Sequence, residues 1–134
     1  MTEVSSIVRK GLLDTSVFIA REAGRPMGEL PDISAISVVT LAELHLGVLM
    51  AHGANVRTLR LRTLTAVQNA FEPLPIDSDV ARTFAELVSA ARRLSRKPKI
   101  MDLWIAATAA AHDLVVYTQD QDFMSIPGIQ VQTV

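Results

Sequence analysis

The sequence predicts an α/β fold with a mostly parallel sheet that helices cover on both faces. Two observations lead to this prediction. The chain contains short apolar runs typical of strands, and between them lie longer segments whose apolar residues recur at helical spacing. Such alternation is typical of βαβ units, in which helices join parallel strands and pack on the sheet. With 134 residues, 49% of them hydrophobic, the chain can bury one substantial core, so we expect a single domain over residues 1–134.

The first half of the chain contains two predicted strands and three predicted helices. The strands are short and bounded by polar residues, whereas the helices show apolar residues three and four positions apart. Gly24 and Gly53 mark two of the breaks between them. The predicted elements are a buried strand at 9–14, a helix at 16–23, a strand at 33–38, and helices at 40–51 and 54–71.

The second half begins with EPLPI, residues 72–76, which we predict as a short third strand. Asp77 is a good N-cap for a helix that should end before Pro98. MDLWIAATAAAH, residues 101–112, is predicted as a further helix. LVVYT, residues 114–118, is rich in strand formers, and IPGIQVQTV ends the chain with a predicted edge strand.

The composition excludes several kinds of protein. The chain has no cysteine, which rules out disulfides and thiolate metal sites. The uncharged stretch at 103–112 is too short and too rich in alanine to span a bilayer, and the N-terminus lacks a signal-peptide pattern. We therefore expect a cytoplasmic protein without membrane contact.

One segment is strongly basic although the net charge is only −1. Between residues 82 and 99 the chain has six basic residues and one acid. The segment could contact nucleic-acid phosphates, or it could be the solvated end of a helix, where cations complement the helix dipole. Its candidate contact residues are Arg92, Arg93, Arg96, Lys97 and Lys99.

Two acids are predicted to meet at one edge of the sheet. In GLLDTSVFIA the carboxylate of Asp14 lies among apolar residues, where it needs a hydrogen-bonding partner or a cation. Asp120 lies just beyond LVVYT, the second predicted strand with an acid after it. Because ligands in α/β folds bind at the carboxyl ends of the strands, we expect Asp14 and Asp120 to line one crevice.

Two further acids, Glu43 and Asp102, lie early in predicted helices. Each acid has a purely structural alternative. Thr40-x-x-Glu43 fits a capping box, Asp102 could complement a helix dipole, and Asp14 could be an N-cap. Asp120 and Asp122 could both be turn formers.

The four acids taken together favour a metal site. Two carboxylates about 4 Å apart repel by about 4 kcal/mol at an effective dielectric of 20, so a cluster must bind protons or a cation. Oxygen ligands without cysteine suit Mg²⁺ or Mn²⁺. The three histidines show no ligand spacing, and we assign none of them to the site.

At this point the chain resembles a known family. LLDTSVFIA, SVVTLAELHLGV and KIMDLWIAATAAAHDLVVYTQDQDF occur in the order and spacing of PIN-domain ribonucleases, and specifically of the VapC toxins of toxin-antitoxin pairs. The resemblance implies a three-layer α/β/α sandwich with a central, mostly parallel sheet. It also implies an acidic site that binds one or two Mg²⁺ ions, with Mn²⁺ as a substitute, and cleaves RNA with an activated water.

The resemblance assigns roles to residues of this chain. Asp14, Glu43 and Asp102 match the first three acids of the family, which bind the metal. Asp120 best matches the fourth, and Asp122 remains a rival for that position. Thr15 and Ser16 match hydroxyls that orient the site, and we expect one of them to hydrogen-bond Asp14 or a metal-bound water.

The resemblance also implies partners. It predicts a VapB-like antitoxin that covers the acidic site, an RNA substrate such as tRNA or rRNA, a homodimer, and contact with promoter DNA only through the antitoxin. The basic segment then becomes a better candidate for the RNA backbone. Two alternatives remain: a non-catalytic PIN scaffold that binds RNA or a protein, and a phosphoryl-transfer domain of the aspartate type, for which LLDTSV lacks the acidic pair.

Overall fold

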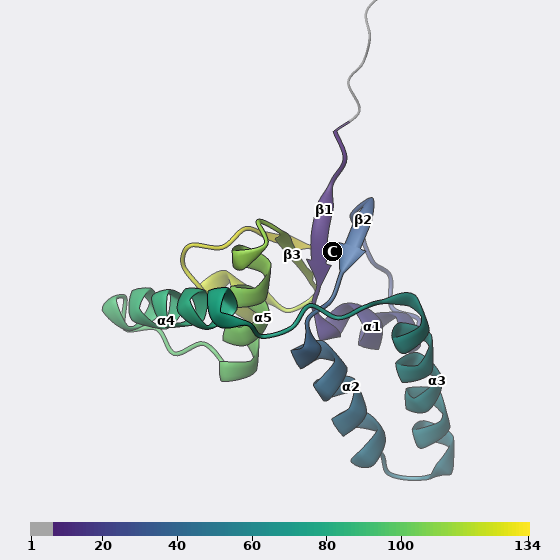
Figure 1. The fold of residues 1–134 in the computed structure, drawn as a ribbon. Coiled ribbons are helices and arrows are strands. Elements are labelled where there is room, and N and C mark those ends of the chain that lie inside the picture. The colour runs from purple at the N-terminus through teal and green to yellow at the C-terminus, as the bar shows by residue number, and fades with distance from the viewer. Residues whose placement is uncertain (1–6) are drawn as a thin grey trace, which may run out of the picture.

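The computed structural model describes residues 7–134. It has the predicted α/β class, with a parallel sheet between two groups of helices (Figure 1). The elements in chain order are β1 (Lys10–Leu13), α1 (Thr15–Glu22), β2 (Ile33–Ala35), α2 (Val38–Leu49), α3 (Ala54–Ala70), α4 (Ser78–Arg93), α5 (Ile100–Ala111), β3 (Val115–Thr118), a 3-10 helix η1 (Gln121–Ser125) and β4 (Val131–Thr133).

The sheet has the strand order β2-β1-β3-β4, and every pair of neighbours is parallel. Because all four strands run the same way, the loops that leave β1, β2 and β3 begin at the same edge. The centre of the sheet is tight: a Cβ on Gly11 would overlap the ring of Tyr117 on the neighbouring strand β3.

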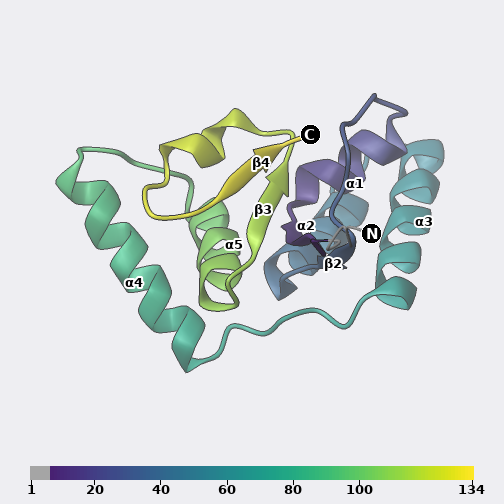
Figure 2. The ribbon, with the colours of Figure 1, turned by 90° about the horizontal axis from the view of Figure 1, so that it is seen from above.

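The two faces of the sheet carry separate hydrophobic cores. Consecutive strand residues alternate between them, so that Leu12 packs with α4 and α5, whereas Leu13 packs with α1, α2 and α3. Figure 2 shows β3 and β4 between α4 and α5 on one side and α1, α2 and α3 on the other. Within the first core, Phe84 of α4 stacks on Trp104 of α5 with ring centroids 3.7 Å apart.

The predicted third strand at 72–76 is wrong. Leu74 makes only an isolated parallel bridge with Ser37, in which the Leu74 amide donates to the Ile36 carbonyl at 2.8 Å. Its neighbours Pro73 and Pro75 have no amide hydrogen, so the ladder cannot extend in either direction.

The predicted strand at 33–38 is shorter than expected. β2 ends at Ala35, and Ser37 starts α2 by accepting hydrogen bonds from the amides of Val39 and Thr40 at 3.1 and 3.3 Å. The cap overrides the strand preference of the β-branched residues that follow it. None of the helices in residues 7–134 combines the length and the apolar character that crossing a membrane requires.

Candidate active site

A cavity of about 300 Å³ opens at the carboxyl edge of the sheet. The acids that line it come from four separate parts of the chain: the end of β1, the middle of α2, the first turn of α5 and the loop after β3. The sequence alone predicts two of these acids at this edge, and the fold brings all four to it. They are Asp14, Glu43, Asp102 and Asp120, and the hydroxyl residues Thr15 and Ser16 and the cation Lys99 line the same cavity.

Asp14 is buried directly after β1, where it is also the N-cap of α1. Three donors converge on its Oδ2 atom. The Ser16 hydroxyl donates at 2.7 Å, the Ser16 amide at 3.3 Å and the Thr118 hydroxyl at 2.9 Å. The expected hydrogen bond from one of the two hydroxyl residues is therefore present, and it comes from Ser16. With Oδ2 fixed in this way, Oδ1 is left for a ligand in the cavity.

Glu43 is not part of a capping box. The N-cap of α2 is Ser37, three residues before Thr40, so Glu43 lies in the second turn of the helix and cannot reach the cap. Its Oε1 atom accepts a hydrogen bond of 2.7 Å from the Thr15 hydroxyl. Burial raises the pKa of Glu43, the Thr15 hydrogen bond opposes this, and the nearby Asp14 raises the pKa further.

Asp102 carries a buried oxygen that lacks a hydrogen-bond partner among the described residues. This atom is Oδ2, on a residue that is 9% exposed in the first turn of α5. Burial raises the pKa of Asp102 to about 6, the charges of Asp14 and Asp120 add to the effect, and Lys99 opposes it. An ionised carboxylate in such a place needs a positive partner.

The segment after β3 contributes two acids, Asp120 and Asp122. One carboxylate oxygen from each of Asp102, Asp120 and Asp122 can be chosen so that all three lie within 4.8 Å of one another. Asp120 is the N-cap of η1 and lines the cavity. Asp122 is more exposed and forms an ion pair of 3.4 Å with Lys99. The carboxylates of Asp122, Asp120 and Asp102 raise the pKa of Lys99.

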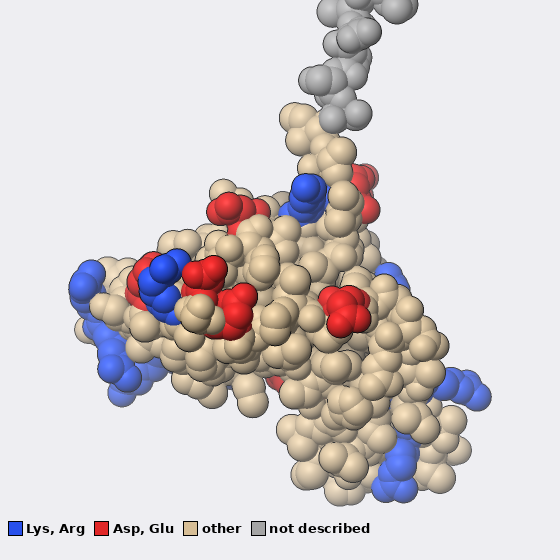
Figure 3. Space-filling view, in the orientation of Figure 1, with Lys and Arg blue, Asp and Glu red and all other residues tan. Residues whose placement is uncertain are grey.

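The basic segment divides between two places. Of its five candidate residues, Lys99 lies at the acidic cavity, whereas Arg92 and Arg93 end α4 and Arg96 donates to the Ser125 carbonyl at 3.3 Å. Figure 3 shows Lys and Arg side chains gathered over the far end of α4, away from the α2 and α3 hairpin. Lys99 is thus the member of the segment at the acidic cavity, and the arginines lie toward the end of α4.

Sequence reasoning missed two hydroxyl residues that organise the site. Thr118 is fully buried; besides its bond to Asp14, its hydroxyl accepts from the Asp120 amide at 2.9 Å. Thr40 is also fully buried and lies 3.1 Å from the Thr15 hydroxyl. Thr118 could have been predicted at the site, because it is a polar residue at the end of the apolar run LVVYT. Thr40 could not, because its position was explained by a helix cap.

Residues 11–129 match the PIN domain family. The curated relatives include Ribonuclease VapC5 and Ribonuclease VapC4 of Mycobacterium tuberculosis. VapC5 is 48% identical over 127 residues, covering 93% of each chain. VapC4 is 46% identical over 132 residues, covering 95% of this chain and 98% of the relative.

The solved structures give the same result. A toxin-antitoxin complex of the VapBC family from Mycobacterium tuberculosis, VapBC-5, contains a chain that superposes with a TM-score of 0.83. It is 45% identical, and the match covers 93% of this chain and 97% of that chain. The chain therefore belongs to the VapC ribonucleases, a branch of the PIN domain family.

Proposed function

We propose that the chain is the toxin of a toxin-antitoxin pair and that it hydrolyses RNA phosphodiesters with the help of Mg²⁺, or Mn²⁺ in its place. The observation that carries this proposal is a buried oxygen of Asp102 that has no hydrogen-bond partner within residues 7–134, in a cavity that Asp14, Glu43 and Asp120 also line. Membership in the VapC ribonucleases supports the reaction class, and the acidic cavity supports the metal.

The residues at the cavity fit a hard divalent cation. All candidate ligands are carboxylate oxygens, which Mg²⁺ and Mn²⁺ prefer. Burial raises the pKa of Asp102 and Glu43, and the charge of Asp14 adds to this, so the ionised forms of both acids would be stabilised by a bound cation. We propose that Asp14, Glu43, Asp102 and Asp120 hold one or two ions, with Asp122 as a further ligand once it is released from Lys99.

The bound cation supplies two things: it lowers the pKa of a water molecule and offsets the charge that grows on the phosphate during in-line attack. The protein holds the ligands in place for this. Ser16 and Thr118 fix one oxygen of Asp14, and Thr15 fixes one oxygen of Glu43. Lys99, at the edge of the cavity, is placed to contact a phosphate of the RNA.

We further propose the partners. A VapB-like antitoxin would cover the acidic cavity, and its DNA-binding half would connect the complex to promoter DNA. The solved relative at 45% identity is itself a toxin-antitoxin complex, which supports this partner. We also propose that the chain forms a homodimer, that it acts in the cytoplasm, and that its substrate is a structured RNA such as tRNA or rRNA.

Purified chain should cleave RNA with Mg²⁺ or Mn²⁺ and stop when the metal is chelated. Asp14→Asn should abolish cleavage and leave the circular dichroism spectrum unchanged, and its expression should no longer arrest growth. Glu72→Gln, which removes an exposed charge outside the site, serves as the matched control. The proposal fails if neither metal supports cleavage and the Asp14 variant is as toxic as the parent. Mapping the RNA ends in expressing cells would identify the substrate.

A further inference from the structure

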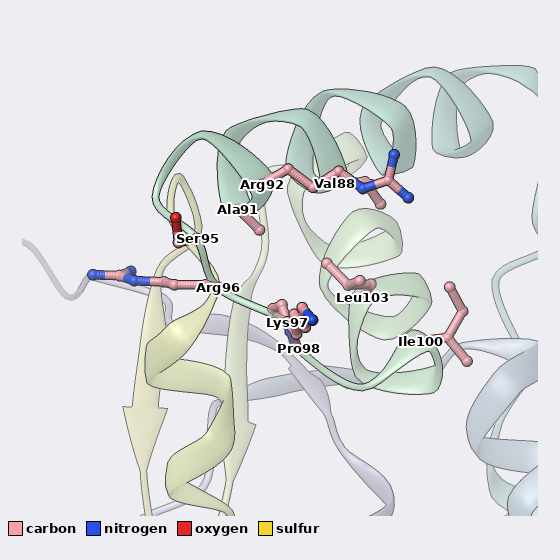
Figure 4. Close-up of a pocket in the computed structure, with 9 residues that line it drawn as sticks. All are labelled: Val88, Ala91, Arg92, Ser95, Arg96, Lys97, Pro98, Ile100 and Leu103. Atoms are coloured by element: carbon pink, nitrogen blue, oxygen red, sulfur yellow. The ribbon is translucent and has the colours of Figure 1, made fainter.

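A second cavity, of about 520 Å³, lies between the last turn of α4, the loop that follows it and the first turn of α5 (Figure 4). Its walls are mainly apolar, and this volume falls in the range of small-molecule sites, about 300–1,000 Å³. The apolar lining residues are Val88, Ala91, Pro98, Ile100 and Leu103. The acidic chemistry described above uses none of these side chains.

The charges at this cavity are all positive. Arg92, Arg96 and Lys97 line it, and none of its nine described lining residues is acidic. In Figure 4 the Arg92 side chain runs along the rim beside Val88, whereas Arg96 points away from the cavity. Arg92 and Lys97 are therefore the cations that a bound ligand would meet, and an anionic ligand is favoured.

The two cavities are neighbours. Ile100 lines both of them, and Lys99, next to it in the chain, lines the acidic one. A strand of RNA held at the acidic cavity can therefore pass over Ile100 and reach the apolar one. Proteins recognise single-stranded RNA through unstacked bases that are splayed out and packed against side chains.

We propose that the apolar cavity holds a nucleobase of the RNA near the cleaved bond, while Arg92 and Lys97 contact the phosphates on either side of that base. This inference rests on the ribonuclease function proposed above. The apolar walls suit the face of a base, and the cationic rim suits its phosphates. An apolar protein segment fits less well, because it would leave the charges of Arg92 and Lys97 without a partner, whereas RNA supplies a phosphate for each.

The first experiment compares two adjacent arginines. Arg92→Ala and Arg93→Ala remove the same charge from the last turn of α4, but only Arg92 lines the cavity. Both are made in the Asp14→Asn chain, so that a fluorescent single-stranded hexanucleotide stays intact during anisotropy measurements. Arg92→Ala should weaken binding and lower the salt slope by about 1, whereas Arg93→Ala should leave both near the parent values. Equal effects of the two substitutions would mean a diffuse basic surface and would overturn the proposal.

The second experiment tests the base itself. Val88 is partly buried at the edge of the core and lines the cavity, so Val88→Phe should fill the cavity; an unchanged melting temperature would show that the core is intact. The probes are the hexanucleotide and an abasic oligomer of equal length. The substitution should weaken binding of the hexanucleotide by about 10-fold and leave the abasic oligomer unchanged. Equal loss for both probes, or no loss for either, would overturn the proposal.

A third outcome would identify a different occupant. If Val88→Phe weakens binding of the cognate antitoxin and leaves the hexanucleotide unchanged, the cavity is a protein site and the proposal is wrong. Cleavage by the unsubstituted chain is measured separately. If the chain cleaves RNA but substitutions at Arg92 and Val88 have no effect, only the proposed base site is refuted. If binding depends on the base but the chain does not cleave RNA, only the proposed catalytic function is refuted.

Discussion

Thr118 and Asp14 lie 104 positions apart in the chain, and a hydrogen bond of 2.9 Å joins the Thr118 hydroxyl to Asp14 Oδ2. The two residues end and follow neighbouring parallel strands, β3 and β1. The same hydroxyl accepts from the amide of Asp120. Thr118 thus fixes the positions of two acids relative to each other, and we expect it to be a positioning residue for the metal site.

Thr118→Val should weaken cation binding while preserving the shape of the side chain. The substitution leaves the Asp120 amide and Asp14 Oδ2 each without one partner, which costs about 1–3 kcal/mol of stability. Titration calorimetry with Mn²⁺ should show reduced affinity, and urea unfolding should show the lost stability. Thr118→Ser, which keeps the hydroxyl, should restore most of both; a serine variant as impaired as the valine variant would argue against this role.

Asp102→Asn should stabilise the protein when metal is absent. The pKa of Asp102 is raised to about 6 in the folded chain. Between about pH 4 and 6, therefore, the Asp102 carboxyl is still protonated in the folded chain but has lost its proton in the unfolded chain. Stability from this group is therefore present at low pH and falls as pH rises through that window. With a chelator at about pH 8, Asp102→Asn should raise the free energy of unfolding by about 1–2 kcal/mol, with little effect at about pH 4.

Added Mg²⁺ should make the parent chain more stable than the Asp102→Asn variant. It should stabilise the parent chain at about pH 8, where Asp102 is ionised, and stabilise the Asp102 variant much less. Glu72→Gln, an exposed charge outside the site, should behave like the parent in both tests. A parent chain whose thermal unfolding ignores Mg²⁺ at every pH would contradict the role given to Asp102.

Lys99→Met should move the acidic limb of the rate profile to higher pH. Lys99 lowers the pKa of both Asp102 and Glu43, so its removal makes these acids keep their protons at higher pH. The maximal rate of RNA cleavage at saturating substrate, measured against pH, would show the change. Lys97→Met removes the same charge from the neighbouring cavity and should alter affinity without moving the limb. Identical pH profiles for Lys99→Met and the parent would refute the coupling.

Gly11→Ala adds only one methyl group but should lower the free energy of unfolding. The added Cβ would overlap the Tyr117 ring, and it would lie 3.0 Å from the Pro31 ring. Overpacking of this kind costs about 1–3 kcal/mol, which urea unfolding would detect. Gly28→Ala is the matched control, because the nearest atom to its added Cβ is 3.6 Å away. Similar stabilities for the two variants would mean that Tyr117 can move aside.

Most of the fold could be predicted because local signals and tertiary structure agree. The spacing of apolar residues located the helices, and the alternation of strands and helices gave the parallel sheet. The error at 72–76 has a local cause, since apolar residues at Leu74 and Ile76 imitate a strand whereas Pro73 and Pro75 prevent one. The β2 boundary was misplaced because Ser37, buried and polar, acts as a cap that the flanking valines concealed.

The site was less predictable than the fold. Asp14 could be placed from its position after an apolar strand, and its meeting with Asp120 follows from the shared carboxyl edge of parallel strands. Its hydrogen-bond partner Thr118 ends β3, a strand that only the folded sheet brings next to β1. The ion pair between Lys99 and Asp122 joins the start of α5 to η1. No local sequence pattern predicts this contact. Sequence reasoning can name acids that need a partner, but the partners of such acids are chosen by tertiary contacts.

The stacked pair of Phe84 and Trp104 has a practical consequence. The chain has one tryptophan, and it is packed between α4 and α5 on one side of the sheet. Tryptophan fluorescence therefore reports on that half of the molecule and is much less sensitive to the half that contains α1, α2 and α3. A refolding trace followed at this single fluorophore, set beside one from circular dichroism, would show whether the two halves acquire their structure together or one after the other.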